Sequence, residues 1–177
     1  MSNVTVSADN QTLPEWSERA RQFSLKVLKE INRSNWELSI HLCGDKKIAE
    51  LNKQYRKKDE PTDILSFNLG ETVKKGGKAV YLPGDIVISL DTLQANSIYF
   101  NIPEDEELRR LLIHGILHLD GMEHTTADTD EPMLALQEKI LNKLNKETII
   151  TQTKPQRRAR QGKQAKVSAE EKIENPV

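Results

Sequence analysis

The chain has 177 residues, of which 36% are hydrophobic and 30% are charged, and it contains one cysteine. This length suits one domain of ordinary size, and no apolar run approaches the roughly 18 residues that would span a bilayer. A single cysteine excludes an internal disulfide, and the N-terminus lacks the basic start and apolar stretch of a secretory signal. We therefore expect a protein of the reducing cytoplasm that does not enter a membrane.

Charge is distributed unevenly along the chain. Residues 151–177 carry seven Lys or Arg against three Asp or Glu, a net +4, which leaves residues 1–150 with a net −5. The segment after residue 150 also has almost no large apolar side chains, so we predict one domain over 1–150 followed by a disordered basic tail over 151–177. This tail either binds phosphate groups or only increases the solubility of the protein. An acidic domain would bind nucleic acid only through a local basic patch.

Hydrophobic periodicity predicts alternating strands and helices in the first part of the chain. In order these are a strand around Val4 and Val6, a helix from about Trp16 to Ile31, a strand from Trp36 to Cys43 and a helix from Asp45 to about Tyr55. Asp45 is the expected N-cap of its helix. His41 falls on the polar side of its strand and has no partner nearby in the sequence, so we interpret it as a surface histidine.

The second part of the chain continues the alternation. We predict strands Ile64–Leu69 and Asp85–Leu90, a helix capped by Asp91 that runs through Ile98, a helix from about Glu104 to Leu119, and a last helix after Pro132 with Leu134, Ile140, Leu141 and Leu144 on its buried side. Gly76 and Gly77, among lysines, mark an exposed loop or hairpin tip between the two strands. The predicted fold class is α+β, with a central mixed sheet of about four strands packed against helices.

Three of the four histidines lie within eleven residues, in a pattern typical of a metal site. His114 and His118 are four apart on a predicted helix, so both imidazoles share one face. Gly121 can turn the chain so that His124 returns to the same point. An isolated histidine is more often a solvated side chain, but this spacing predicts one divalent ion, most readily zinc, at the end of a helix. Three protein ligands with an open fourth position are typical of catalytic zinc.

The same spacing occurs in metzincin metalloproteases, where a glutamate follows the first histidine and acts as the general base. This chain has Gly115 at that position. Peptide hydrolysis would therefore need a substitute carboxylate such as Glu123 or Asp120. A metzincin-like metallohydrolase is one alternative function.

Three segments of the chain resemble the YbeY family, the bacterial endoribonucleases of rRNA maturation. They are HGILHLDGMEH at residues 114–124, LNKQYRKKDEPTDILSF at residues 51–67 and GDIVIS at residues 84–89, within a match that extends from about residue 36 to 146. The N-terminal strand and helix also fit the family. Two positions depart from its pattern: Lys57 stands where a glycine is common, and Met122 where an aromatic residue is common.

The resemblance implies an activity and assigns roles to individual residues. His114, His118 and His124 would bind Zn²⁺ or another divalent transition metal, and Arg56 would be the catalytic or phosphate-binding arginine. The implied function is single-strand-specific, metal-dependent endoribonuclease activity in maturation of the 16S rRNA 3′ end and late-stage 70S ribosome quality control. The implied partners are ribosomal RNA and the ribosome or its proteins. A non-catalytic ribosome-assembly factor is a further alternative.

The segment before the second predicted strand has both functional and structural interpretations. Lys53, Arg56, Lys57 and Lys58 form the densest basic cluster before residue 151, and we interpret it as the RNA-facing patch. Asp63 either contributes to that site or simply forms a local turn bond before the strand. The sequence does not separate these two roles.

Overall fold

The computed structural model describes residues 1–9 and 12–151. Its elements are β1 (Asn3–Ala8), α1 (Ser17–Glu30), β2 (Trp36–Cys43), α2 (Asp45–Arg56), β3 (Ile64–Lys75), β4 (Lys78–Ser89), α3 (Leu90–Phe100), α4 (Glu104–Leu119) and α5 (Pro132–Lys143). The predicted α+β class with a mixed sheet of about four strands is confirmed. Apart from Thr151, the predicted tail lies outside the described residues. No helix in the described ranges is long and apolar enough to cross a membrane.

The four strands form one sheet in the order β1-β2-β4-β3. β1 and β4 run parallel to β2, whereas β3 runs antiparallel to β4. The C-terminal ends of β2 and β4 therefore lie at one edge of the sheet, where Cys43 pairs with Ser89, and β3 begins at the same edge. Because α2 and α3 start directly after β2 and β4, this edge collects loops and helix ends, as is typical of ligand sites in sheets with parallel strands.

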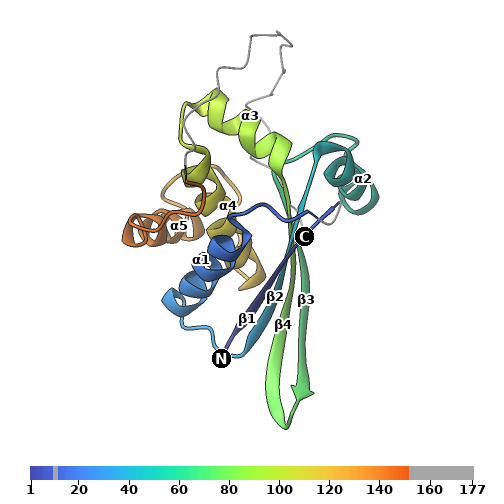
Figure 1. The fold of residues 1–177 in the computed structure, drawn as a ribbon, viewed down its shortest axis with the longest axis vertical. Coiled ribbons are helices and arrows are strands. Elements are labelled where there is room, and N and C mark those ends of the chain that lie inside the picture. The colour runs from blue at the N-terminus through green and yellow to red at the C-terminus, as the bar shows by residue number, and fades with distance from the viewer. Residues whose placement is uncertain (10–11, 152–177) are drawn as a thin grey trace.

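Helices cover the two faces of the sheet unequally (Figure 1). α1, α4 and α5 lie on one face and enclose the main core, to which α3 contributes Leu93. α2 covers the opposite face near the edge described above, over a small cluster of Cys43, Ile48, Leu65 and Val87. α4 lies within the main core and buries ten of its sixteen residues, which holds any side chain on its surface in a fixed place.

β3 and β4 form a longer hairpin than predicted. Of the two predicted possibilities, an exposed loop or a hairpin tip, the structure shows the hairpin: Thr72 lies opposite Tyr81 and Val73 opposite Val80, and only the turn at Gly76 and Gly77 separates the strands. Periodicity could not show this, because most side chains of this extension are exposed and carry no apolar alternation. Backbone pairing with the partner strand holds the extension together.

The predicted N-caps of α2 and α3 are wrong. Gly44, not Asp45, is the N-cap of α2, and Ser89, whose hydroxyl accepts from Thr92 N, is the N-cap of α3. The two aspartates instead join the adjacent helix starts: Asp91 Oδ2 accepts from Asp45 N at 2.9 Å, and Asp45 Oδ1 accepts from the Ser89 hydroxyl at 2.6 Å. This exchange requires β2 and β4 to end side by side, which the local sequence does not reveal.

We expect Cys43 to react slowly with thiol reagents. Its side chain is 5% exposed in the cluster beneath α2, and burial above all raises the pKa of the thiol to about 11. The reactive thiolate is therefore scarce at neutral pH. Ellman's reagent should label the folded protein far more slowly than the urea-unfolded protein at the same pH. Equal rates would show that this face of the sheet opens readily.

Candidate metal centre

Helix α4 carries the first two histidines of the candidate site, and its end carries the chain to the third. His114 and His118 are one turn apart near its C-terminus. Gly121 has φ +85°, and its N–H donates to His118 O at 2.9 Å while Met122 N donates to Leu117 O at 3.0 Å. These bonds close the helix in the manner of a Schellman motif, as the glycine in the sequence predicted, and turn the chain back toward His118.

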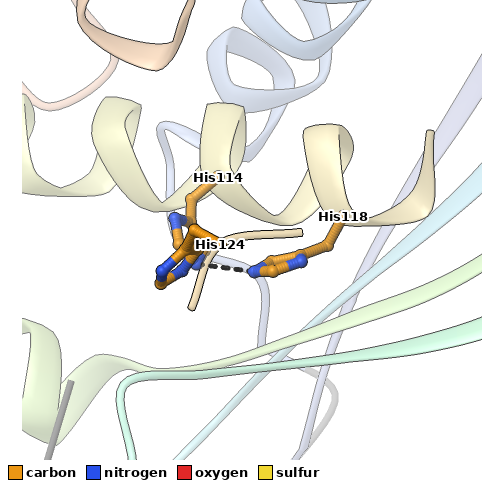
Figure 2. A group of neighbouring side chains, drawn as sticks. All are labelled: His114, His118 and His124. Carbon is orange, nitrogen blue, oxygen red and sulfur yellow. Dashed lines mark hydrogen bonds between the residues drawn. The ribbon is translucent and has the colours of Figure 1, made fainter. Parts of the chain in front are cut away.

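The three imidazoles converge (Figure 2). One nitrogen from each ring belongs to a set whose members all lie within 4.8 Å of one another, a spacing that could hold a metal ion. His114 Nε2 and His118 Nε2 are 3.0 Å apart. Two nitrogens bound to one tetrahedral zinc at 2.0–2.1 Å would be separated by about 3.3 Å, so a small adjustment would admit the ion.

Each ring is oriented by a hydrogen bond from its other nitrogen. Nδ1 of His114 bonds to Gln137 Oε1 at 2.8 Å, Nδ1 of His118 to Met122 O at 3.0 Å, and Nδ1 of His124 to Thr126 O at 2.9 Å. Because carbonyl oxygens only accept, these three bonds favour the tautomer that carries its proton on Nδ1 and offers Nε2 to a metal ion. Such outer partners commonly orient metal-binding histidines.

Two further features fit a cation at this point. His124 Nε2 is buried and has no hydrogen-bond partner among the described residues, a situation that costs free energy unless a ligand fills it. Burial above all lowers the pKa of His118, with His124 and Arg56 acting in the same direction and Glu123 opposing them. A lowered pKa keeps the ring neutral, the form that binds metals.

A cavity of about 380 Å³ adjoins the histidines and lies between α2, α4 and α5. His114 and His124 line it from one side, and Arg56 and Lys58 line it from the C-terminal end of α2. Partial burial of the Arg56 guanidinium lowers its pKa, yet an arginine in this setting stays charged at every physiological pH. The fold therefore brings Arg56, at the end of α2, and Lys58, just after it, to one cavity with His114 on α4 and His124 in the loop beyond α4.

The predicted basic patch divides into two parts. Arg56 and Lys58 line the cavity, whereas Lys53 pairs with Asp59 at 2.5 Å and Lys57 Nζ donates to Gln54 O at 3.1 Å on the exposed surface. Asp63 lines the cavity and also forms the predicted local bond, because its Oδ1 accepts from Ile64 N at 2.9 Å. Its Oδ2 accepts from the Asn96 amide at 3.2 Å.

Lys57 has φ 63° at the C-cap of α2, the left-handed conformation that explains why glycine suits this position. We expect Lys57→Gly to stabilise the protein by up to about 1 kcal/mol, since it removes backbone strain but adds chain entropy. Urea unfolding would measure the change. The matched variant Lys53→Gly, in the helical part of α2, should destabilise by about 0.5–1 kcal/mol. A loss of stability in Lys57→Gly would contradict this account.

Gly115 faces the sheet and not the metal centre. A Cβ at this position would lie 2.9 Å from Ile86 Cδ1 and 3.0 Å from Ile64 Cδ1, so a glutamate has no room there. Asp120, the first candidate substitute base, is paired with Arg33. Glu123 is nearer, with Oε2 at 3.4 Å from His118 Nδ1. The arrangement that serves peptide hydrolysis in metzincins is therefore not reproduced.

His41 takes no part in the cluster. Its Nδ1 bonds to the Ser7 hydroxyl at 2.9 Å and its Nε2 to Asp9 at 2.8 Å, and the side chain is partly exposed. The ring therefore links β2 to Ser7 on β1 and to Asp9, which follows β1. A structural role of this kind agrees with its placement on the polar side of the strand.

Sequence reasoning missed two buried polar residues beside the cavity, Gln137 on α5 and Glu107 on α4. A signal was present for the first, because Gln137 interrupts the apolar face formed by Met133, Ile140 and Leu141. Leu134, which was predicted to be buried with that face, is only partly buried and lines the cavity, while Met133 takes the core position. Glu107 gave no such signal, because it is one of four consecutive acidic residues at the start of α4 and such residues are usually exposed.

The fold and the site together define an α+β protein whose three imidazoles could hold a metal ion beside a cavity with cationic residues. A family model described as endoribonuclease YbeY matches residues 2–145. The endoribonuclease YbeY of Treponema denticola is 48% identical over 124 residues, 70% of this chain and 80% of that protein. The endoribonuclease YbeY of Treponema pallidum is 44% identical over 142 residues, 80% of this chain and 89% of that protein.

A solved structure has a similar fold. The solution structure of TM1509 from Thermotoga maritima is 26% identical and has a TM-score of 0.58, covering 81% of this chain and 90% of that one. The chain belongs to the YbeY family of endoribonucleases, and RNA is its substrate.

Proposed function

We propose that the protein is a zinc-dependent, single-strand-specific endoribonuclease that matures the 3′ end of 16S rRNA and acts in late-stage 70S ribosome quality control. The observation that carries the metal-dependent part is the convergence of three Nε2 atoms whose rings are each held by an Nδ1 hydrogen bond. The family carries the rRNA part. The compartment that follows is the cytoplasm, where ribosomal RNA and ribosomal proteins are the partners.

His114, His118 and His124 would hold the ion through Nε2. The ion supplies Lewis-acid stabilisation of charge on the reacting phosphate when it is bound. Imidazole nitrogens also suit nickel and copper, so the choice of zinc rests on three ligands with a neutral tautomer and an open fourth position. Met122 O and Thr126 O, which accept hydrogen bonds from Nδ1 of His118 and His124, are backbone atoms of this chain and orient these two rings without help from a ligand.

Arg56 and Lys58 perform the electrostatic part of the reaction. Cleavage of a phosphodiester bond concentrates negative charge on the phosphorus oxygens, and a guanidinium donates two parallel hydrogen bonds to such a group. The Arg56 side chain is exposed on the cavity wall, so a phosphate that enters the cavity can reach its guanidinium. Lys58, also on the cavity wall, adds a second cation that draws the RNA backbone in. We assign Arg56 as the catalytic residue that holds the scissile phosphate.

Cleavage of a 16S rRNA 3′-end fragment by the zinc-loaded protein tests the proposal. We expect Arg56→Ala to lower the rate by about a hundredfold to a thousandfold, the range found when one donor to a developing oxyanion is removed. Arg56→Lys should recover only part of the rate, since it keeps the charge but loses the paired donors. Lys53→Ala is the matched control, because Lys53 is a cation on the same helix that pairs with Asp59 and does not line the cavity.

The controls separate this activity from contaminating nucleases and from a purely structural role. A chelator should stop cleavage, and zinc should restore it in the wild type but not in Arg56→Ala. A duplex of the same fragment should resist cleavage. If every variant cuts alike, or if none cuts while ribosome association persists, the chain acts as a ribosome-assembly factor without catalysis.

A further inference from the structure

The wall of the cavity contains a buried carboxylate, one oxygen of which receives no hydrogen bond from the described part of the chain. Glu107 lies on α4, its side chain is 2% exposed, and it lines the same cavity as His114. Its Oε1 is buried and accepts no hydrogen bond from the described residues. A buried carboxylate oxygen without a hydrogen bond costs folding free energy, so a ligand that brings a donor to it would bind more tightly.

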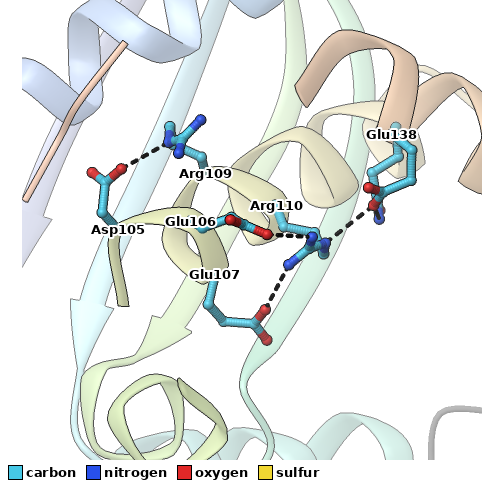
Figure 3. Close-up of polar contacts among 7 residues, drawn as sticks. Asp105, Glu106, Glu107, Arg109, Arg110 and Glu138 are labelled. Atoms are coloured by element: carbon cyan, nitrogen blue, oxygen red, sulfur yellow. Dashed lines mark hydrogen bonds and ion pairs between the residues drawn. The ribbon is translucent and has the colours of Figure 1, made fainter. Parts of the chain in front are cut away.

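The other oxygen of Glu107 belongs to a network around Arg110 (Figure 3). Arg110 Nη1 donates to Glu107 Oε2 at 3.3 Å, Nη2 to Glu106 Oε1 at 2.9 Å and Nε to Glu138 Oε1 at 3.1 Å. The network extends to the metal centre, because Gln137 donates to Glu138 Oε1 at 3.1 Å and accepts from His114. The Arg110 guanidinium thus holds the Glu107 carboxylate through Oε2, and Oε1 can accept a hydrogen bond from a ligand.

The chemistry of this wall restricts what can bind there. Three carboxylates around one guanidinium repel a phosphate. A resident metal ion is also a poor fit, because the described groups spaced closely enough to hold one do not include Glu107. An uncharged group with an N–H or O–H donor can pair with Oε1 and meets neither of these objections. Ile64, Leu111 and Leu134 supply apolar walls beside it, which suit a flat aromatic ring.

The position of Glu107 suits the base of the nucleotide whose phosphate lies at Arg56. Glu107 and His114 are seven residues apart on α4, or about 10 Å along the helix axis, so the carboxylate does not share a ligand atom with the metal centre. Arg56, Lys58 and Glu107 all line the same cavity. A nucleotide whose phosphate contacts the two cations would therefore have its base inside the cavity that Glu107 lines.

We propose that this cavity is a base-binding subsite in which Glu107 Oε1 accepts a hydrogen bond from an amino group of the nucleobase. The proposal rests on the RNA-cleaving function argued above. Adenine, guanine and cytosine carry such a group, whereas the N3–H of uracil lies between two carbonyl oxygens that the carboxylates repel. Glu107 is therefore the specificity-determining residue, and the enzyme discriminates against uracil at this position.

Nucleotide binding tests the subsite without any cleavage. The zinc-loaded protein is titrated calorimetrically with cytidine, uridine, adenosine and guanosine 5′-monophosphates and with ribose 5-phosphate, which has the phosphate and hydroxyls but no base. We expect the cytidine, adenosine and guanosine monophosphates, which carry the amino group, each to bind about tenfold tighter than uridine monophosphate and than ribose 5-phosphate, the range of one hydrogen bond to a charged group. This comparison needs no variant.

Glu107→Gln then tests the assigned residue. It keeps the shape but replaces the charge, and we expect it to reduce the cytidine preference to about twofold or less while ribose 5-phosphate and zinc bind as before. Glu106→Gln is the matched control, since Glu106 also bonds to Arg110 but does not line the cavity, and it should keep the full preference.

Two results would overturn the subsite: nucleotides that bind no tighter than ribose 5-phosphate, or a cytidine preference that survives in Glu107→Gln. Tighter binding of ribose 5-phosphate than of every nucleotide would assign Oε1 to a ribose hydroxyl instead, which also overturns it. A protein that shows the preference but cuts no RNA would refute the proposed function and leave the subsite standing.

Discussion

Replacing His118 by alanine should abolish zinc binding at the three-histidine site and with it RNA cleavage. Removing even an outer hydrogen-bond partner of a metal ligand typically costs ten- to a hundredfold in affinity, and removing the ligand itself should cost more. His118 bears the lowered pKa, and its Nε2 lies 3.0 Å from that of His114. Calorimetric titration with zinc measures the effect directly and does not depend on RNA.

His41→Ala is the matched control for this experiment. It also removes a histidine, but one that bonds to Ser7 and Asp9 on β1 and beyond, away from the cluster. It should bind one zinc ion with the affinity of the wild type. If His118→Ala binds zinc as tightly as His41→Ala does, the cluster is not the metal site.

Zinc binding should persist to a more acidic pH than an ordinary histidine site would allow. Protons compete with the metal for Nε2, and an unperturbed histidine is half protonated near pH 6.5. Because burial lowers the pKa of His118, the ring stays neutral below that pH and competition begins later. Titrations from about pH 7.5 to about pH 5.5 should therefore show a Kd that changes little through about pH 6.5 and weakens only at more acidic pH. A Kd that already weakens at or above about pH 6.5 would contradict the lowered pKa.

Gly84→Ala should be among the most destabilising single substitutions in the protein. Gly84 has φ +132°, and a Cβ there would lie 1.9 Å from the backbone oxygen of Phe67 and 2.9 Å from Leu69 N. These are backbone atoms of the adjacent strand β3, at the point where its register with β4 shifts, so no side-chain rotation relieves the overlap. We expect a loss of about 3 kcal/mol or more and a Tm lower by about 10 °C.

Gly76→Ala provides the comparison for this prediction. Gly76 also has a positive φ, +54°, but nothing lies within 4 Å of the added Cβ at the hairpin tip. It should cost only about 1 kcal/mol of backbone strain. Urea unfolding of both variants separates steric overlap from strain, and equal losses would show that the close approach of β3 to β4 is not what requires glycine.

Features that depend on nearby residues were predicted correctly from the sequence. The helix that carries His114 and His118, the turn at Gly121 and the alternation of β2 all follow from spacing over a few residues. The caps of α2 and α3 were predicted incorrectly because Asp45 and Asp91 bond to each other's helix start. The length of the β3–β4 hairpin was underestimated because its outer part is paired but largely exposed.

The candidate site shows the same division. Local spacing was enough to predict that His114, His118 and His124 would converge, because a helical turn and one glycine place them together, and the family resemblance singled out Arg56. Three features depend on how distant segments pack: Arg56 and Lys58 share a cavity with those histidines, Gln137 orients His114, and Glu107 keeps one oxygen with no hydrogen bond from the described residues. These contacts join α2, α4 and α5, and the order of strands and the packing of helices set such distances, which local spacing cannot encode.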